Sequence, residues 1–168
     1  MVSSGNQREL ERYLGEYSAG ADNLSPLNYC ENYVVDVILR HFAALCARQE
    51  VELTVSARIP ETLAVTDADI CSLISNLLEN ALEACAYVAG KKRISITVKQ
   101  VRSQLVLLVD NSFDGAAGMR EGRFLSRKRR EREGVGLASV RAIAAKYGGK
   151  AVFTPDAEKG IFHSEVTL

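Results

Sequence analysis

The chain has 168 residues, of which 47% are hydrophobic and 25% charged, so it can bury one well-formed core but is short for two. Its 21 basic and 21 acidic residues cancel, and a formal net charge of zero gives no reason to expect nucleic acid as a partner. No apolar run reaches the roughly 20 residues of a bilayer-spanning helix, and no signal-peptide pattern is present. We therefore expect a cytoplasmic chain that makes no membrane contact itself.

The four cysteines have no CxxC spacing and lie in apolar patterns of helical period, which predicts buried, reduced thiols. They are Cys30, Cys46, Cys71 and Cys85. The two histidines, His41 and His163, are far from them in sequence and show no ligand spacing, which argues against a zinc site.

Residues 1–20 are predicted to form a helix with a narrow apolar stripe at i, i+3, i+4 and i+7. The stripe consists of Leu10, Tyr13, Leu14 and Tyr17. This helix is either the tail of a longer dimerisation helix or an N-terminal helix that lies on the domain. Residues 21–29 are rich in turn-forming residues and predict a hinge, and residues 30–168 then form the main domain.

Hydrophobic periodicity and turn residues predict the elements of that domain. They are a helix at 31–49, a strand at 51–59, a helix at 66–88 capped by Thr66 or Asp67, strands at 93–101 and 105–109, a long irregular segment at 110–133, a helix at 134–148, and strands at 150–154 and 160–168. Strands in hairpins with helices between them predict an α+β fold, a two-layer sandwich with a mixed sheet and helices on one face.

The central predicted helix carries an unusual polar ridge. Asn76, Glu79, Asn80 and Glu83 fall within an arc of roughly 100° on the side away from most of its apolar residues. Such a ridge can be merely solvated, but asparagine is a poor helix former and occurs here twice, four residues apart. An amide oxygen is a neutral, hard ligand that suits a partly hydrated Mg2+ carrying phosphates.

Two further motifs follow. Asp110 ends an apolar strand and begins the segment DNSFDG, where a carboxylate can accept a hydrogen bond from an exocyclic amine and Gly115 permits a turn. Gly134 and Gly136 open the next helix, where free backbone N–H groups and the helix dipole favour phosphate. Each motif is weak alone, but their order, with a basic run at 127–132 between them, is more specific.

Together these segments resemble the GHKL ATP-binding superfamily, which includes gyrase B, MutL and sensor histidine kinases. NLLENALEA at 76–84 resembles its N box, DNSFDG at 110–115 its first glycine box, and GVGL at 134–137 its second. The resemblance covers about residues 25–168 and is nearest to histidine kinases of the accessory-gene-regulator, quorum-sensing type. It implies the Bergerat α/β sandwich and ATP with Mg2+ as ligands.

The resemblance also implies roles for individual residues. Asn80 would ligate Mg2+, Asn76 would lie near the phosphates, Asp110 would read adenine, and Lys128 with Arg130 would hold the γ-phosphate from a lid. The implied nucleotide-binding set is completed by Asn111, Gly115, Ser126, Gly134, Gly136 and Leu137. The basic run can also be a solvated, mobile loop.

Asn76 bears on the reaction class. Hydrolases of this superfamily carry glutamate there to activate water, and an amide cannot act as a base. Transfer of the ATP γ-phosphoryl group to a histidine, which has its own lone pair at neutral pH, fits better. Glu79 and Glu83 remain alternative bases.

Three departures from the family pattern matter. The first glycine box lacks glycine at Ser112 and Asp114, the second begins with Glu133, and no phosphoacceptor box is found, because His41 and His163 are interpreted as structural. We therefore expect a fragment whose acceptor histidine, dimerisation helix and membrane anchor lie upstream in the parent kinase, and whose downstream partner is a response regulator. Two alternatives are an anti-sigma-factor-type serine kinase with Glu79 as base, and a non-catalytic nucleotide-binding or dimerisation module.

Overall fold

The computed structural model describes Gly15 and residues 28–116, 119–120, 123–126, 129–133 and 135–168. The main domain consists of α2 (Tyr33–Arg48), β1 (Glu52–Arg58), α3 (Asp67–Cys85), β2 (Arg93–Val101), β3 (Gln104–Ser112), α4 (Val135–Lys146), β7 (Lys150–Asp156) and β8 (Ile161–Thr167). The predicted N-terminal helix and most of the predicted hinge lie outside the described residues.

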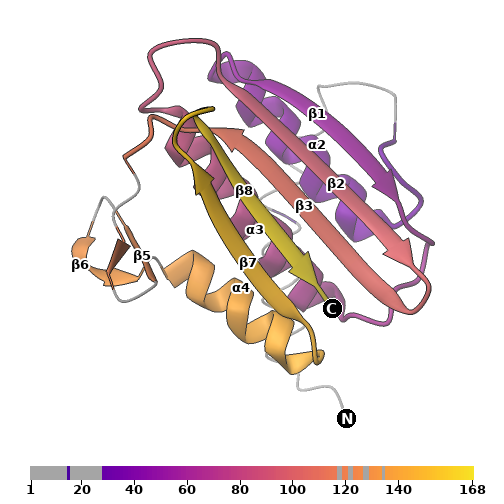
Figure 1. Cartoon of the computed structure of the whole chain (residues 1–168). Helices are drawn as coiled ribbons and strands as arrows, with labels where there is room; N and C mark the ends of the chain where they lie inside the picture. Colours follow the sequence, from indigo (N-terminus) through magenta and orange to yellow (C-terminus); the bar gives the residue numbers. More distant parts are fainter. Residues whose placement is uncertain (1–14, 16–27, 117–118, 121–122, 127–128, 134) are drawn as a thin grey trace.

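The five main strands form one mixed sheet in the order β1-β2-β3-β8-β7. β1 pairs with β2 in parallel, and α3 forms the crossover connection that parallel neighbours need; the other pairs are antiparallel. The helices α2, α3 and α4 lie together on one face of the sheet (Figure 1). The predicted two-layer sandwich with a mixed sheet is therefore confirmed.

The core lies between the helices and the sheet because each element has one apolar face. Along β2 and β3 the buried residues alternate with more exposed ones, so every second side chain points toward the helices. They are Ile94, Ile96, Val98, Leu105, Leu107 and Val109. The apolar stripe of α3 covers them, and Leu73, Ile74 and Leu78 are fully buried. Within the described part of the chain, no helix is both long and apolar enough to cross a bilayer.

The start of α3 is set by Thr66, one of its two predicted caps. The Thr66 side chain accepts a hydrogen bond from the backbone N–H of Asp69, as an N-cap residue does. The helix ends at Cys85, three residues before the predicted end. All four cysteines are free thiols; Cys30 is half-buried and the other three are buried.

The prediction of an irregular segment at 110–133 is wrong in two respects. β3 continues through Ser112, because its last residues pair with the beginning of β8, with Asn111 opposite Phe162. Farther on, β4 (Met119–Arg120), β5 (Arg123–Ser126) and β6 (Arg129–Glu133) form a separate three-stranded sheet. Both results depend on pairing between distant residues, which local turn signals do not report.

Candidate functional site

The two amide side chains of α3 lie directly against the first turn of α4. A Cβ atom placed on Gly136 would be 3.0 Å from Oδ1 of Asn76 and 3.2 Å from Nδ2 of Asn80. Any larger residue would therefore press on both amides. Glycine at this position lets the N-terminal backbone of α4 and the amide pair share one small space.

The amide group of Asn76 is fixed within its own helix. Its Nδ2 donates to the carbonyl oxygen of Ser72 at 2.7 Å and lies 3.2 Å from the Ser72 hydroxyl. The donor side of the amide is thereby used, and Oδ1 is the atom nearest to Gly136. Asn76 thus offers an acceptor to the space beside α4, and it has no titratable proton there.

Asn80, in contrast to Asn76, offers a hydrogen-bond donor to the same space. Its Nδ2 atom is buried and finds no hydrogen-bond partner among the residues that the structure describes. A buried donor without an acceptor costs roughly 1–3 kcal/mol, so such groups mark sites that an ion, a water molecule or a ligand completes. A phosphate oxygen would satisfy Nδ2, while the amide oxygen of the same side chain is a suitable ligand for Mg2+. The residues present therefore fit a magnesium-bound phosphate group.

The structure does not bring Asp110 to this space. Because β3 is still a strand at this point, its side chains keep alternating, and Asp110 projects from the face of the sheet that carries no helix. There its Oδ1 lies 2.7 Å from Nδ1 of His163, on the adjacent strand β8. The sequence analysis placed Asp110 at the end of an apolar strand, whereas β3 continues through Ser112 and keeps this side chain on the face opposite the helices.

Asn111 occupies the helix side of the sheet instead. It is 4% exposed, and its Nδ2 donates to the carbonyl oxygen of Ser112 at 3.0 Å. Asn111, and not Asp110, is therefore the polar residue at the end of β3 that faces the helix layer. Counted from Asn111, the box NSFDG has Phe113 at its first glycine position and Gly115 at its second.

An aromatic anchor replaces the first of these glycines. The Phe113 ring is 7% exposed and meets Phe162 edge-to-face with centroids 6.0 Å apart. The Phe113 backbone N–H donates to the carbonyl oxygen of Gly160 at 3.0 Å. The chain then turns at Gly115, whose φ of +81° lies in the region that glycine adopts without strain.

The other predicted site residues lie in α4 and in the three-stranded sheet, or outside the described residues. Leu137 is buried in the first turns of α4, and the backbone of Ser126 and Arg130 lies in β5 and β6. Lys128 and Gly134 lie outside the described residues.

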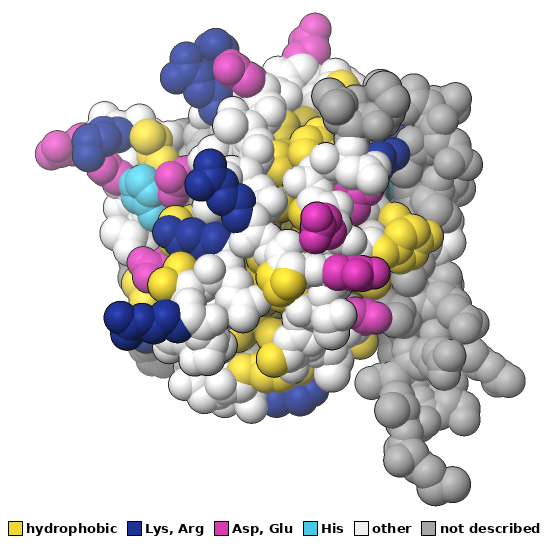
Figure 2. Space-filling model, turned by 90° about the vertical axis from the view of Figure 1, so that its right-hand side faces the viewer, with side chains coloured by type: hydrophobic (Ala, Val, Ile, Leu, Met, Phe, Trp, Pro, Cys, Tyr) yellow, Lys and Arg dark blue, Asp and Glu magenta, His cyan; other side chains and the backbone are white. Residues whose placement is uncertain are grey.

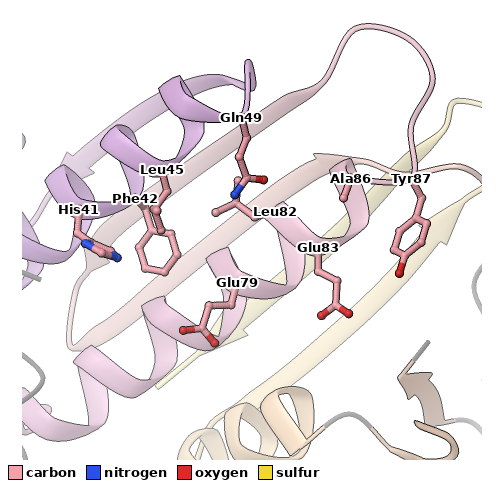
Figure 3. A pocket seen from close by; sticks show the side chains of 9 residues that line it. All are labelled: His41, Phe42, Leu45, Gln49, Glu79, Leu82, Glu83, Ala86 and Tyr87. Atoms are coloured by element: carbon pink, nitrogen blue, oxygen red, sulfur yellow. The ribbon is translucent and has the colours of Figure 1, made fainter. Parts of the chain in front are cut away.

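A second hollow, of about 460 Å³, lies between α2 and α3 on the other side of the polar ridge. Figure 3 shows Glu79 and Glu83 projecting from α3 on its rim, with His41 and Phe42 on α2. Burial, with a smaller effect of Arg48, lowers the pKa of His41, so the imidazole is neutral at pH 7. The ridge predicted from the sequence is thus divided: the asparagines face α4, and Glu79 borders this hollow.

At the edge of the molecule formed by β1 and α2, the surface of the sheet layer and that of the helix layer differ in charge. Basic side chains are more frequent on its sheet side, and a group of acidic side chains lies on its helix side (Figure 2). The exposed basic residues of β1 and β2 include Arg58 and Arg93.

The architecture is that of histidine kinase catalytic domains. The catalytic domain of histidine kinase ThkA is similar with a TM-score of 0.60 and 19% identity, over 80% of this chain and 91% of that chain. The histidine kinase domain of the Erythrobacter litoralis EL346 blue-light activated histidine kinase has a TM-score of 0.60 and 16% identity, over 96% and 78%. The Acinetobacter baumannii histidine kinase AdeS has a TM-score of 0.53 and 19% identity, over 96% and 77%.

The sequence itself assigns the family. A family model described as the GHKL domain matches residues 65–168, from the residue before the α3 cap to the residue after β8. The chain therefore belongs to the GHKL family. A comparison with curated proteins finds no match.

Proposed function

We propose that this chain binds Mg·ATP as the catalytic domain of a sensor histidine kinase and transfers the γ-phosphoryl group to a histidine on a dimerisation helix. The observation that carries the proposal is the buried Nδ2 of Asn80, which has no hydrogen-bond partner in the described part of the chain and lies beside Gly136 at the start of α4. An amide pair and a helix N-terminus together offer donors and a metal ligand to phosphate.

Each residue near this space has a separate task in the proposal. Asn80 would hold Mg2+ through its amide oxygen and donate from its nitrogen to a phosphate oxygen, and Asn76 would offer its Oδ1 as a hydrogen-bond acceptor beside them. Backbone N–H groups near Gly136 and Leu137 would receive the phosphates, and the family resemblance adds Gly134 to this set. Bound Mg2+ would neutralise phosphate charge and orient the chain of phosphates.

The base end of the site is proposed to lie at Asn111 in place of Asp110. The Asn111 oxygen is an acceptor suited to the exocyclic amine of adenine, and Phe113 and Gly115 hold the following turn. Ser126, Lys128 and Arg130 are proposed to contact the γ-phosphate from the lid. This part of the proposal depends on the family resemblance.

The absence of a carboxylate at Asn76 favours transfer to histidine over hydrolysis. Glu79 is the base that a serine kinase would need, and it borders the hollow between α2 and α3, beside His41. A nucleophile with its own lone pair needs no such base. We further propose the accessory-gene-regulator type, a cytoplasmic location, a membrane-anchored parent and a response regulator downstream.

Titration calorimetry with ATP, in the presence and absence of Mg2+, tests the function. Wild-type protein is expected to bind Mg·ATP, and Asn80→Ala to lose at least tenfold in affinity. The control is Gln100→Ala, which removes an exposed amide at the far end of β2 and is expected to change nothing. Equal Mg·ATP affinity for wild type and Asn80→Ala would refute the metal-ligand assignment.

A thermal-shift experiment separates the kinase from a non-catalytic module. ATP, ADP and a non-hydrolysable analogue with Mg2+ are expected to raise the melting temperature of the wild type, because ligands that bind only the native state stabilise it. If none of the three nucleotides shifts the melting temperature, the non-catalytic module becomes the better explanation.

A further inference from the structure

The far end of the α3–α4 pair is closed by a compact polar cluster. One oxygen of Asp69, Oδ2, accepts hydrogen bonds from three groups: the Tyr147 hydroxyl at 2.5 Å, Lys146 Nζ at 2.6 Å and the Thr66 hydroxyl at 2.9 Å. Asp69 belongs to the first turn of α3, whereas Lys146 and Tyr147 lie at the end of α4. We call this cluster the Asp69 clamp.

The clamp also engages the backbone at the start of α3. The Tyr147 hydroxyl accepts a hydrogen bond from the backbone N–H of Thr66 at 3.1 Å, while it donates to Asp69. Only 17% of the Asp69 side chain is exposed, so its ion pair with Lys146 is less screened than a pair in open water. Tyr147 therefore joins α4 to the α3 cap residue as well as to the carboxylate.

The two helices run antiparallel, and the clamp and the amide site lie at opposite ends of the same contact. At 1.5 Å per residue, the eleven steps from Asp69 to Asn80 span about 16 Å, and the ten steps from Gly136 to Lys146 about 15 Å. These nearly equal lengths place Gly136 close to the level of Asn80 when Lys146 is level with Asp69. Between these ends Val140 and Ala144 are fully buried.

The close packing of Gly136 at the start of α4 thus depends on where the Asp69 clamp holds the end of that helix. Gly136 lies so near the amides that even a Cβ atom added to it would be 3.0 Å from Asn76 Oδ1 and 3.2 Å from Asn80 Nδ2, so a shift of α4 along its axis would alter the amide geometry. The packed middle of the pair transmits such a shift because protein interiors have little empty volume.

We propose that Asp69, through Tyr147 and Lys146, is a positioning residue for the phosphate-binding end of the site and fixes the register of α4 against the amide pair. The inference rests on the proposed nucleotide-binding function and extends it to residues about 15 Å from the amides. At this distance the clamp would not reach a phosphate bound at the amides, and its effect is expected at the phosphate end only, because the proposed base end lies on β3.

Tyr147→Phe and Asp69→Asn test the proposal in two measurements. The first compares the dissociation constants of Mg·ATP and of adenosine, which carries no phosphate. We expect at least fivefold weaker Mg·ATP binding with less than a twofold change for adenosine. The second follows the side-chain amide resonances of Asn80 by NMR in ligand-free protein, and we expect them to move in both variants.

The matched controls are Tyr33→Phe and Asp156→Asn. Tyr33 is 68% exposed at the start of α2, and Asp156 pairs with Lys159 in the β7–β8 turn, so neither change is expected to affect the readouts. A lower melting temperature with unchanged Mg·ATP affinity and unchanged Asn80 resonances would overturn the proposal, as would an equal loss for adenosine. If wild-type protein binds no nucleotide, the proposed function fails, and the Asn80 resonances alone decide whether the clamp positions α4.

Discussion

Nδ1 of His163 and Oδ1 of Asp110 lie 2.7 Å apart on the face of the sheet that carries no helix. Both side chains are more than 40% exposed, and such surface pairs contribute less than about 1 kcal/mol to stability. The pairing of β3 with β8 therefore places both side chains on this face, and their ion pair itself contributes little to folding.

We therefore predict that Asp110→Asn leaves the preference for ATP over GTP unchanged within twofold.

Asn111→Ala should weaken ATP binding by about fivefold to tenfold, because it removes one buried hydrogen bond worth roughly 1 kcal/mol. Asn111→Asp should sharpen the preference for ATP, since a carboxylate accepts from the adenine amine but repels the guanine oxygen. Calorimetry with both nucleotides measures all three variants, and a selective loss in Asp110→Asn would contradict the assignment.

Gly136→Ala tests the close approach of α4 to the amide pair. The new methyl group would lie 3.0 Å from Asn76 Oδ1, so we expect at least tenfold weaker Mg·ATP binding. The free energy of unfolding should fall by no more than about 1 kcal/mol, because the higher helix propensity of alanine offsets part of the cost of the close contact. Gly90→Ala is the control, since nothing lies within 4 Å of its added Cβ. Unchanged affinity in Gly136→Ala would show that the amides tolerate displacement.

The consecutive glycines after α4 should differ sharply in their tolerance of alanine. Gly148 has φ +73° with nothing near its Cβ, so Gly148→Ala should cost about 1–2 kcal/mol of left-handed strain. In Gly149→Ala the methyl group would lie 1.8 Å from the carbonyl oxygen of Thr167, in the last residue of β8. We expect it to cost more than about 3 kcal/mol, and urea unfolding of the two variants checks the order.

Much of this fold was predictable from the sequence because its elements have strong local signals. The apolar stripe of α3, its cap at Thr66 and the alternation along β2 all report burial directly. The adjacency of Asn76 and Asn80 to the start of α4 was expected from the order of motifs, although their spacing alone does not determine it.

The rest depends on contacts that no local pattern contains. The end of β3 is decided by its pairing with β8, and an error of three residues in that boundary placed Asp110 at the start of an irregular segment instead of within the strand. Asp69 and Tyr147 are 78 residues apart, and neither stands out in its own helix. Only the packing of α3 against α4 brings them together.

The Asp69 clamp also predicts a pH dependence. Burial raises the pKa of Asp69, but hydrogen bonds from Lys146, Tyr147 and Thr66 outweigh it and hold the pKa below the ordinary 3.8. The stabilisation from this carboxylate is therefore complete above pH about 4 and is lost as the pH falls through the lowered pKa. The hydrogen bond from Lys146 to Asp69 raises the pKa of Lys146, so the stabilisation that the charged ammonium group contributes is lost only at strongly alkaline pH.

The free energy of unfolding of wild type and Asp69→Asn should consequently differ by a constant amount between pH 5 and 8, and the difference should shrink below pH 3.8. Urea unfolding at pH 7, 5, 3.5 and 2.5 measures it. Asp156→Asn serves for comparison, because Lys159 also lowers the pKa of Asp156, yet that pair is exposed and should give a smaller difference at pH 7. A difference for Asp69→Asn that persisted undiminished at pH 2.5 could not come from the ionised carboxylate, and the clamp would then owe its strength to neutral hydrogen bonds alone.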